Sequence, residues 1–292
     1  MFFIVSTGRC GSMSLARMLD QHPLCHCLHE PHPILIKLAA EWQHGCLEAD
    51  ELRRYLAFKG SRMFQHRVGP RLYGESDQKL SFLIPFLAEF GRSTKFIWLI
   101  RDGRDVVASM VARDRVYTNH RSHLSGSLWY KYRLRGDRCR DVAADVWDGM
   151  TDFQKCCWSW SYANRTIARS LEDLDARSWI QVRLEELADH LPSLLRFLDL
   201  PFYPVGVLHA NASETGLRDP QAWSKEEKEA FDRWCGQGMD RWYPGWRAGP
   251  IYSRSSVPVC SKGTDAARAI RSHIAWLLGK LVDKAVRGVG CA

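Results

Sequence analysis

Short apolar runs alternate along the chain with longer segments in which apolar residues recur every three or four positions. The short runs predict strands, and the longer segments predict amphipathic helices. The runs "FFIVS" (2–6) and "KFIWLI" (95–100) are almost wholly apolar, which is typical of parallel strands buried on both faces of a sheet. Further strands are predicted at residues 25–28, 71–76 and 178–184.

Helix-like segments separate these strands and follow the last of them. Ser224 is the predicted N-cap of the final helix, and Glu227 three residues later completes a capping box. Strands that alternate with helices predict an α/β fold, here a P-loop-like three-layer α/β/α arrangement with a central parallel sheet. The predicted helices cover residues 12–21, 31–42, 49–59, 80–90, 103–114, 153–171, 185–200 and 224–239.

The pattern predicts one main domain, residues 1–246, followed by a different segment at 247–292. Residues 247–264 are predicted to be a linker, and 265–288 a basic amphipathic helix. We expect this helix to pack on the domain or on a second copy in a homodimer; contact with an anionic lipid surface is the less favoured alternative. Residues 114–148 are polar, aromatic and irregular, which predicts a lid or substrate loop.

Composition changes this picture only at a few points. The net charge of +8 indicates an anionic ligand. The sequence lacks a basic run with interleaved aromatic residues, so we do not expect nucleic acid as the partner. Met1 lies directly before a strand, which leaves no room for a signal peptide, and no apolar stretch approaches the roughly 18 residues needed to span a bilayer. The ten cysteines are therefore expected to be reduced thiols of a cytoplasmic protein.

One cluster of metal-ligand residue types occurs in "CHCLHEPH" (25–32). Cys25, Cys27, His29 and His32 could be drawn as a zinc site, but the two cysteines are too close for the usual spacing. We expect ordinary buried thiols and no metal.

The stretch "STGRCGSMSL" (6–15) joins the first strand to a helix through a turn bounded by Gly8 and Gly11. Backbone N–H groups and the start of a helix at such a turn bind anions. Arg9 adds a planar guanidinium group, and Ser12 and Ser14 add hydroxyls. The lysine of a nucleotide-triphosphate loop is absent from the turn. A tight turn that only packs helix on strand is the alternative.

A second anion site is predicted where "KFIWLI" runs into "RDGRDVVASM". Arg101 ends the strand, and Ser109 follows about two helical turns later on the same helix face. Both side chains can therefore meet one anion. The alternative is a helix-capping network made by Asp102, Arg104 and Asp105.

These two motifs resemble those of the sulfotransferase family. "STGRCGSMSL" is similar to its 5′-phosphosulfate loop and "RDGRDVVAS" to its 3′-phosphate motif. "HPLCHCLHEP", "YGES" and "VRLEELADHLPSLLRFLDLP" resemble other stretches of tyrosyl-protein and bacterial members. The resemblance runs from residue 2 to roughly 245, which would make residues 1–246 a sulfotransferase domain.

The resemblance implies a donor, 3′-phosphoadenosine 5′-phosphosulfate (PAPS), and no metal. It implies that a sulfuryl group passes to a hydroxyl of a small-molecule, lipid or carbohydrate acceptor. Arg9 would contact the 5′-phosphate and the bridging oxygen and so be both catalytic and donor-binding. The other implied donor-binding residues are Cys10, Gly11, Ser12, Met13, Ser14, Arg101 and Ser109.

Glu30 falls where tyrosyl-protein members have a catalytic glutamate and is the expected base for the acceptor hydroxyl. The alternative is an ion pair with a loop arginine. His29 should point to the opposite face of the strand. Lys79 is left unassigned, and Leu184 stands where relatives carry an aromatic residue. An acceptor cleft could be lined by Trp129, Tyr130, Tyr132, Trp147, Trp158 and Trp160.

Two other functions stay open. A P-loop kinase-like phosphotransferase would need a loop lysine beside a magnesium-binding hydroxyl. A non-catalytic protein that binds nucleotide or anionic lipid would need the anion sites alone.

Overall fold

A computed structural model describes residues 1–65, 71–112, 117, 132–204 and 219–248 of the chain. Five parallel strands form its sheet in the order β2-β3-β1-β4-β5. This confirms the predicted α/β class and parallel sheet. The strands are β1 (Phe2–Ser6), β2 (Cys25–His29), β3 (Leu72–Ser76), β4 (Lys95–Ile100) and β5 (Trp179–Arg183).

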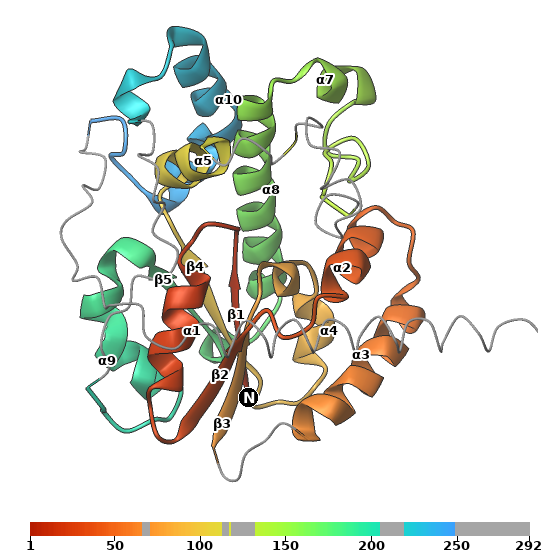
Figure 1. Cartoon of the computed structure of the whole chain (residues 1–292), viewed down its shortest axis with the longest axis vertical. Coiled ribbons are helices and arrows are strands. Elements are labelled where there is room, and N and C mark those ends of the chain that lie inside the picture. Colours follow the sequence, from red (N-terminus) through yellow and green to blue (C-terminus); the bar gives the residue numbers. More distant parts are fainter. Residues whose placement is uncertain (66–70, 113–116, 118–131, 205–218, 249–292) are drawn as a thin grey trace, which may run out of the picture.

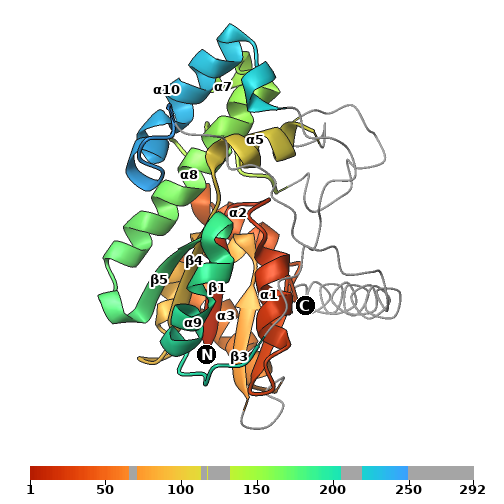
Figure 2. The ribbon, with the colours of Figure 1, turned by 90° about the vertical axis from the view of Figure 1, so that its left-hand side faces the viewer.

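Helices cover both faces of the sheet (Figures 1 and 2). Phe2 and Ile4 of β1 belong to a buried cluster with residues of α1 (Ser12–Asp20) and α9 (Leu187–Phe197). Phe3 and Val5 alternate with them and pack on the opposite side. That side is covered by α2 (Leu35–Gln43), α3 (Ala49–Gln65), α4 (Ile84–Ala88) and α8 (Asp152–Glu172). The alternating side chains of an apolar strand thus need two helical layers.

The long helix α8 extends past the carboxyl edge of the sheet, where α5 (Gly103–Val111) and α10 (Lys225–Trp242) pack against it (Figure 1). Trp160 of α8 is fully buried and meets Trp242 of α10 edge to face, with ring centroids 5.8 Å apart. The predicted capping box of α10 is confirmed, since Ser224 and Glu227 exchange side-chain and backbone hydrogen bonds. These helices hold the end of β4 in place.

Some predicted elements differ from the observed ones. The helix expected at 80–90 is split into a 3-10 helix, η1 (Gln78–Phe82), and α4, because Pro85 lacks an N–H and is suited to a first helical turn. Within the expected lid, α7 (Ala144–Gly149) is helical. Single-turn 3-10 helices η3 (Ala176–Ser178), η4 (Leu184–Glu186) and η5 (Pro220–Ala222) complete the described elements.

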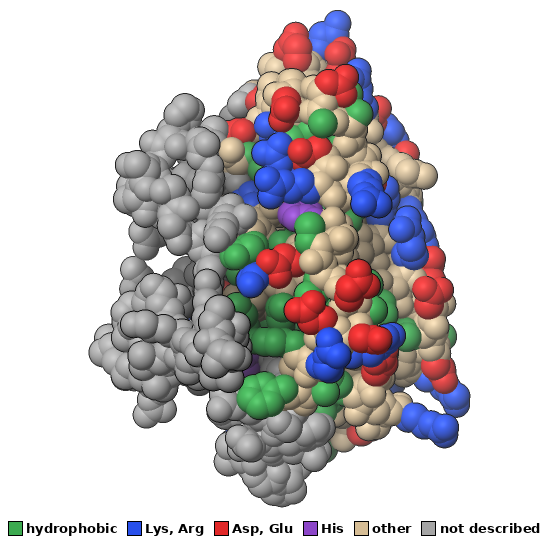
Figure 3. All heavy atoms as spheres, turned by 90° about the vertical axis from the view of Figure 1, so that its right-hand side faces the viewer, with side chains coloured by type: hydrophobic (Ala, Val, Ile, Leu, Met, Phe, Trp, Pro, Cys, Tyr) green, Lys and Arg blue, Asp and Glu red, His purple; other side chains and the backbone are tan. Residues whose placement is uncertain are grey.

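Two predicted segments lie outside the described residues in whole or in part. These are residues 114–116 and 118–131 of the lid predicted at 114–148, and nearly all of the C-terminal segment, at 249–292. The domain boundary near residue 247 therefore stays a prediction. Figure 3 shows one face of the molecule, where basic and acidic side chains are interspersed, so the net positive charge is not concentrated on the described part of this face.

Candidate functional site

The carboxyl ends of the five strands meet at one edge of the sheet, because all the strands are parallel. Ligands of such sheets bind beyond this edge. The first residues after the strands are Thr7, Glu30, Asp77, Arg101 and Leu184. Residues that are far apart in sequence therefore lie together at this edge. They include the loop after β1 and the start of the segment after β4, which are the two predicted anion sites.

The loop between β1 and α1 is tightly folded. Backbone φ angles of 67° at Arg9 and 76° at Gly11 place both residues in the left-handed region. The positive φ favours glycine at position 11, and a Cβ atom there would lie 2.6 Å from Leu184 Cδ1, so either the loop or the Leu184 side chain would have to move. Arg9 adopts the conformation in spite of its side chain, and strain of this kind concentrates at functional sites.

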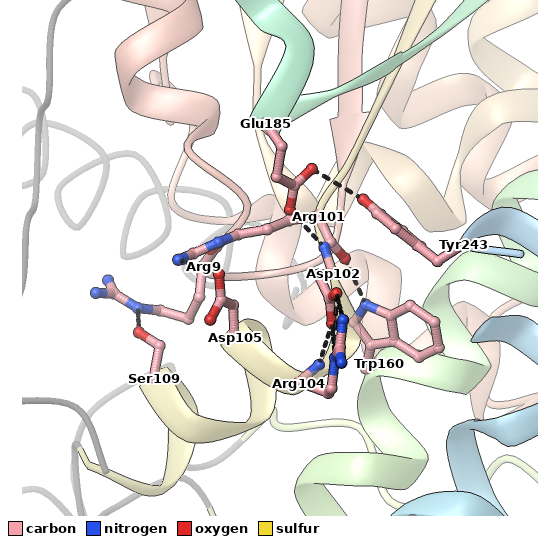
Figure 4. A network of polar contacts seen from close by, with 9 residues as sticks. All are labelled: Arg9, Arg101, Asp102, Arg104, Asp105, Ser109, Trp160, Glu185 and Tyr243. Atoms are coloured by element: carbon pink, nitrogen blue, oxygen red, sulfur yellow. Dashed lines mark hydrogen bonds and ion pairs between the residues drawn. The ribbon is translucent and has the colours of Figure 1, made fainter. Parts of the chain in front are cut away.

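Arg9, Arg101, Asp105 and Ser109 form a connected group, here named the Arg9 cluster (Figure 4). Arg9 Nε donates to Ser109 Oγ at 2.9 Å, and Arg101 Nη1 donates to the backbone carbonyl of Arg9 at 3.1 Å. Arg101 Nη2 also pairs with Asp105 at 3.2 Å. The structure therefore brings together the loop and the β4–α5 junction, as the two motifs predicted.

A buried network fixes the start of α5. Asp102 caps the helix by accepting from the Arg104 N–H at 2.8 Å, and it also binds the Arg104 guanidinium group. The Asp102 N–H donates to Glu185, which accepts a second hydrogen bond from Tyr243 at 3.1 Å. Burial raises the pKa of Glu185. Asp102 and Arg104 thus perform the capping considered from the sequence, whereas Glu185 and Tyr243 were missed.

The remaining loop residues differ in how deeply they are buried. Cys10 is buried, and its Sγ lies 2.6 Å from Thr7 Oγ1. Burial raises the pKa of this thiol to about 11, so it stays neutral, and because Cys10 is fully buried we expect its backbone to meet a ligand. Ser14 is buried, while Ser12 and Met13 are half-buried at the start of α1.

Glu30, at the end of β2, lies beside a buried lysine that the sequence left unassigned. Its N–H donates to the Ser76 carbonyl at 2.9 Å, and a φ of 47° turns the chain there. Its Oε1 lies 3.9 Å from Lys79 Nζ, which is itself 3.1 Å from Asp77 Oδ2. Burial raises the pKa of Asp77, and the Lys79 charge opposes this rise. Within the described ranges, the ion pair of Glu30 is made with Lys79, and no arginine is paired with it.

A cavity of about 90 Å³, the Lys79 pocket, opens between this lysine and the loop after β1. Thr7 and Gly8 reach it, so it adjoins the same loop as the Arg9 cluster. Its lining is mainly apolar, and its charged members are Lys79 and Arg133. The full lining is Ser6, Thr7, Gly8, Ile36, Ala39, Ala40, Gln78, Lys79, Phe82, Met110, Tyr117, Tyr132, Arg133, Leu134, Ser159 and Ala163.

Three of the tryptophans proposed for an acceptor cleft lie in the core instead. Trp147, Trp158 and Trp160 are at most 1% exposed. Tyr132 does line the Lys79 pocket. Trp129 and Tyr130 lie outside the described residues.

The cysteines and histidines of β2 do not assemble a metal site. Cys25 and Cys27 pack in the cluster under α1, and His29 follows them on that strand face. Burial lowers the pKa of His29 to about 4. His32 instead binds the buried carboxylate of Glu75 at 3.1 Å. Across the described ranges, no group of three or more His, Cys, Asp or Glu side chains is placed to hold a metal ion.

A family model described as "Sulfotransferase family" matches residues 2–204. Protein-tyrosine sulfotransferase A of Caenorhabditis elegans is 23% identical over 219 residues, which cover 68% of this chain and 50% of that protein. The protein-tyrosine sulfotransferase of Drosophila melanogaster is 20% identical over 265 residues, which cover 81% of this chain and 47% of that protein. The chain spans about half the length of the curated relatives it matches.

Solved structures are also similar to this chain. The sulfotransferase domain from the curacin biosynthetic pathway has a TM-score of 0.47 at 20% identity, over 80% of this chain and 89% of that one. A sulfotransferase from Alicyclobacillus acidocaldarius has a TM-score of 0.47 at 16% identity, over 84% of this chain and 94% of that one. In the part of the chain that the structure describes, every helix is too short or too polar to cross a membrane.

Proposed function

This chain belongs to the sulfotransferase family, and we propose that it transfers a sulfuryl group from PAPS to an acceptor hydroxyl. The observation that carries the proposal is the Arg9 cluster, in which the loop after β1 and the helix after β4 meet through Arg9, Arg101 and Ser109. A donor with phosphate groups at two positions of its ribose needs two anion sites held side by side. The contacts between the loop and α5 support such a pair of sites.

The hydrogen-bond donors at this junction suit phosphate oxygens. Gly11, the N-cap of α1, has no side chain to occupy the first N–H groups of the helix, so these can point toward an anion. Arg9 and Arg101 add guanidinium groups that match phosphate geometry, and Ser109 adds a hydroxyl. In this proposal Gly11, Ser12, Met13, Ser14 and the Cys10 backbone hold the 5′ end, while Arg101 and Ser109 hold the 3′-phosphate.

PAPS supplies an activated sulfuryl group, whose bond to the 5′-phosphate breaks as the acceptor oxygen bonds to sulfur. In our proposal Glu30 accepts the hydroxyl proton during this attack. Arg9 stabilises the negative charge that builds on the departing phosphate. Lys79, 3.9 Å from Glu30 and buried, orients this carboxylate and adds positive charge beside the loop.

The acceptor hydroxyl belongs to a small molecule, lipid or carbohydrate in this proposal. A tyrosine in a protein is the alternative, favoured by the names of the curated relatives. The Lys79 pocket supports a small acceptor, because its volume is only about 90 Å³.

Binding of the desulfated product, 3′-phosphoadenosine 5′-phosphate (PAP), tests the donor assignment. We expect PAP to raise the melting temperature of the protein in the presence of a chelator, by mass action on the folded state. Incubation with PAPS and a panel of alcohols should then yield products that have gained the mass of a sulfuryl group. Stabilisation by ATP with magnesium but not by PAP would contradict the proposal and favour a phosphotransferase. Binding of PAP without transfer to any alcohol or tyrosyl peptide would favour a non-catalytic protein.

A further inference from the structure

Two cations line the Lys79 pocket, and their surroundings differ. The ammonium group of Lys79 lies 3.1 Å from Asp77 and 3.9 Å from Glu30. Arg133 lies in the same lining, which contains no aspartate or glutamate. The positive charge of the pocket therefore resides chiefly at Arg133.

Arg133 has an unsatisfied buried donor. Its Nε has no hydrogen-bond partner among the described residues, although the atom is buried. The guanidinium carbon lies 5.3 Å from the ring centroid of Tyr117, whose hydroxyl donates to the Leu134 carbonyl. The phenol ring supports the flat face of the cation but offers no acceptor to Nε. A buried charged donor without a partner is costly, so this position favours a ligand that brings an anion.

The rest of the lining sets the shape of such a ligand. Ile36, Ala39, Phe82, Met110 and Leu134 surround the space with apolar side chains. Thr7 and Gly8 of the loop after β1 also line the pocket, as does Lys79, whose Nζ lies 3.9 Å from Glu30 Oε1. A molecule that fills about 90 Å³ must therefore be compact and largely apolar. For the proposed reaction its hydroxyl must also approach Glu30, which lies 3.9 Å from Lys79 of the lining.

We propose that the acceptor is a small hydroxy acid, with an apolar body and a carboxylate that binds Arg133. This rests on the proposed function and assigns Arg133 as a specificity-determining residue of that reaction. The carboxylate accepts hydrogen bonds from the guanidinium group, including the buried Nε, and the hydroxyl at the other end approaches Glu30. An acceptor of the same shape without the acid leaves the Arg133 donor unsatisfied and binds more weakly.

The test uses two compact acids and their methyl esters, 3-hydroxypropanoate and 4-hydroxybutanoate, each added to the protein–PAP complex. Calorimetry measures binding, and transfer of labelled sulfate from PAPS measures kcat/KM. We expect at least one acid to bind about 10–100-fold more tightly than its ester, the scale of a charged hydrogen bond. In Arg133→Gln this ratio should fall to about one, and Arg133→Lys should restore part of it.

Arg135→Gln is the matched control, because Arg135 pairs with Asp137 and Asp148 and does not line the pocket. It should keep the acid preference of the unmodified protein. The inference is overturned if both esters bind as well as their acids, or if neither acid binds. An equal loss on acid and ester in Arg133→Gln also overturns it, since it assigns Arg133 to the donor or to folding.

The two proposals fail in different ways. A protein that does not bind PAP refutes the proposed function. A protein that binds PAP and treats acids and esters alike refutes only the assignment of Arg133. Retained PAP affinity in Arg133→Gln shows that the variant is folded and that its effect is confined to the acceptor.

Discussion

The Arg9 cluster and the Lys79 pocket share the loop after β1 but use their cations differently. In the Arg9 cluster, guanidinium groups reach a serine hydroxyl, a backbone carbonyl and Asp105, so they connect the loop to α5. At the Lys79 pocket, a buried ammonium group lies between Asp77 and Glu30. In the proposed function this difference corresponds to two roles: the Arg9 cluster binds the phosphate groups of PAPS, and Lys79 orients the carboxylate that accepts the proton.

The largest expected effect comes from removing that carboxylate. Glu30→Gln keeps the shape of the side chain but removes the base, so turnover should fall about 10²–10⁴-fold. PAP affinity should be nearly unchanged, because Glu30 is outside the Arg9 cluster. Steady-state rates on one confirmed acceptor and calorimetry with PAP measure the two quantities.

Glu51→Gln, at an exposed position on α3, is the control and should leave both quantities unaltered. Arg9→Ala should lower turnover and PAP affinity together, in contrast to Glu30→Gln. Full turnover in Glu30→Gln, or a loss of PAP affinity in that variant, would contradict the division between the two regions.

The next effect concerns the Arg9 cluster alone. Arg101→Ala should weaken PAP binding by about 1.5–3 kcal/mol, the scale of a hydrogen bond to a charged group. Arg177→Ala is the matched control, because the Arg177 side chain is 91% exposed and pairs with Asp175 far from the cluster. If calorimetry gives the same PAP affinity for Arg101→Ala and the unmodified protein, Arg101 only fastens the loop to β4.

A smaller effect distinguishes a steric clash with Leu184 from backbone strain at Gly11. Gly11→Ala and Gly45→Ala both force an alanine into the left-handed region, at about 1–2 kcal/mol each. Only Gly11→Ala also brings a Cβ to 2.6 Å from Leu184, which should lower the free energy of unfolding by about 1 kcal/mol more. Urea unfolding measures the difference, and PAP affinity should fall only in Gly11→Ala. Equal destabilisation in the two variants would show that Leu184 moves aside.

The smallest effect is a pH dependence of stability at His29, the last residue of β2. Burial lowers the pKa of His29 to about 4 from its ordinary 6.5, so the folded state binds the proton less readily than the unfolded chain. Acidification from about pH 6.5 toward pH 4 therefore favours unfolding. His29→Gln should reduce the loss of melting temperature over this range, while turnover at pH 7.5 should stay nearly unchanged.

His190→Gln, on the exposed side of α9, is the control for that measurement. Identical melting curves for His29→Gln and the unmodified protein across this range would show that His29 is not held neutral. A His29→Gln variant without activity would instead contradict the assignment of the base to Glu30.

Local pattern was sufficient for the strands and most helices. "FFIVS" and "KFIWLI" form β1 and β4 at the expected residues, because an unbroken apolar run is stable only with cover on both faces. The capping box of Ser224 and Glu227 was also predictable from the sequence, because its hydrogen bonds join residues within one turn of the helix. The single helix predicted at 80–90 is instead two elements, η1 and α4, because Pro85 can begin a helix as readily as interrupt one.

By itself, the sequence determined the α/β class, the two anion motifs and the family resemblance, since each depends on residues close together in the chain. Only the tertiary structure decided which distant residues meet. It placed Lys79 beside Glu30 and Arg133 in an apolar pocket, and it buried Trp147, Trp158 and Trp160 in the core. The physical reason is that burial and charge pairing depend on how separate elements pack, and no single element carries that information.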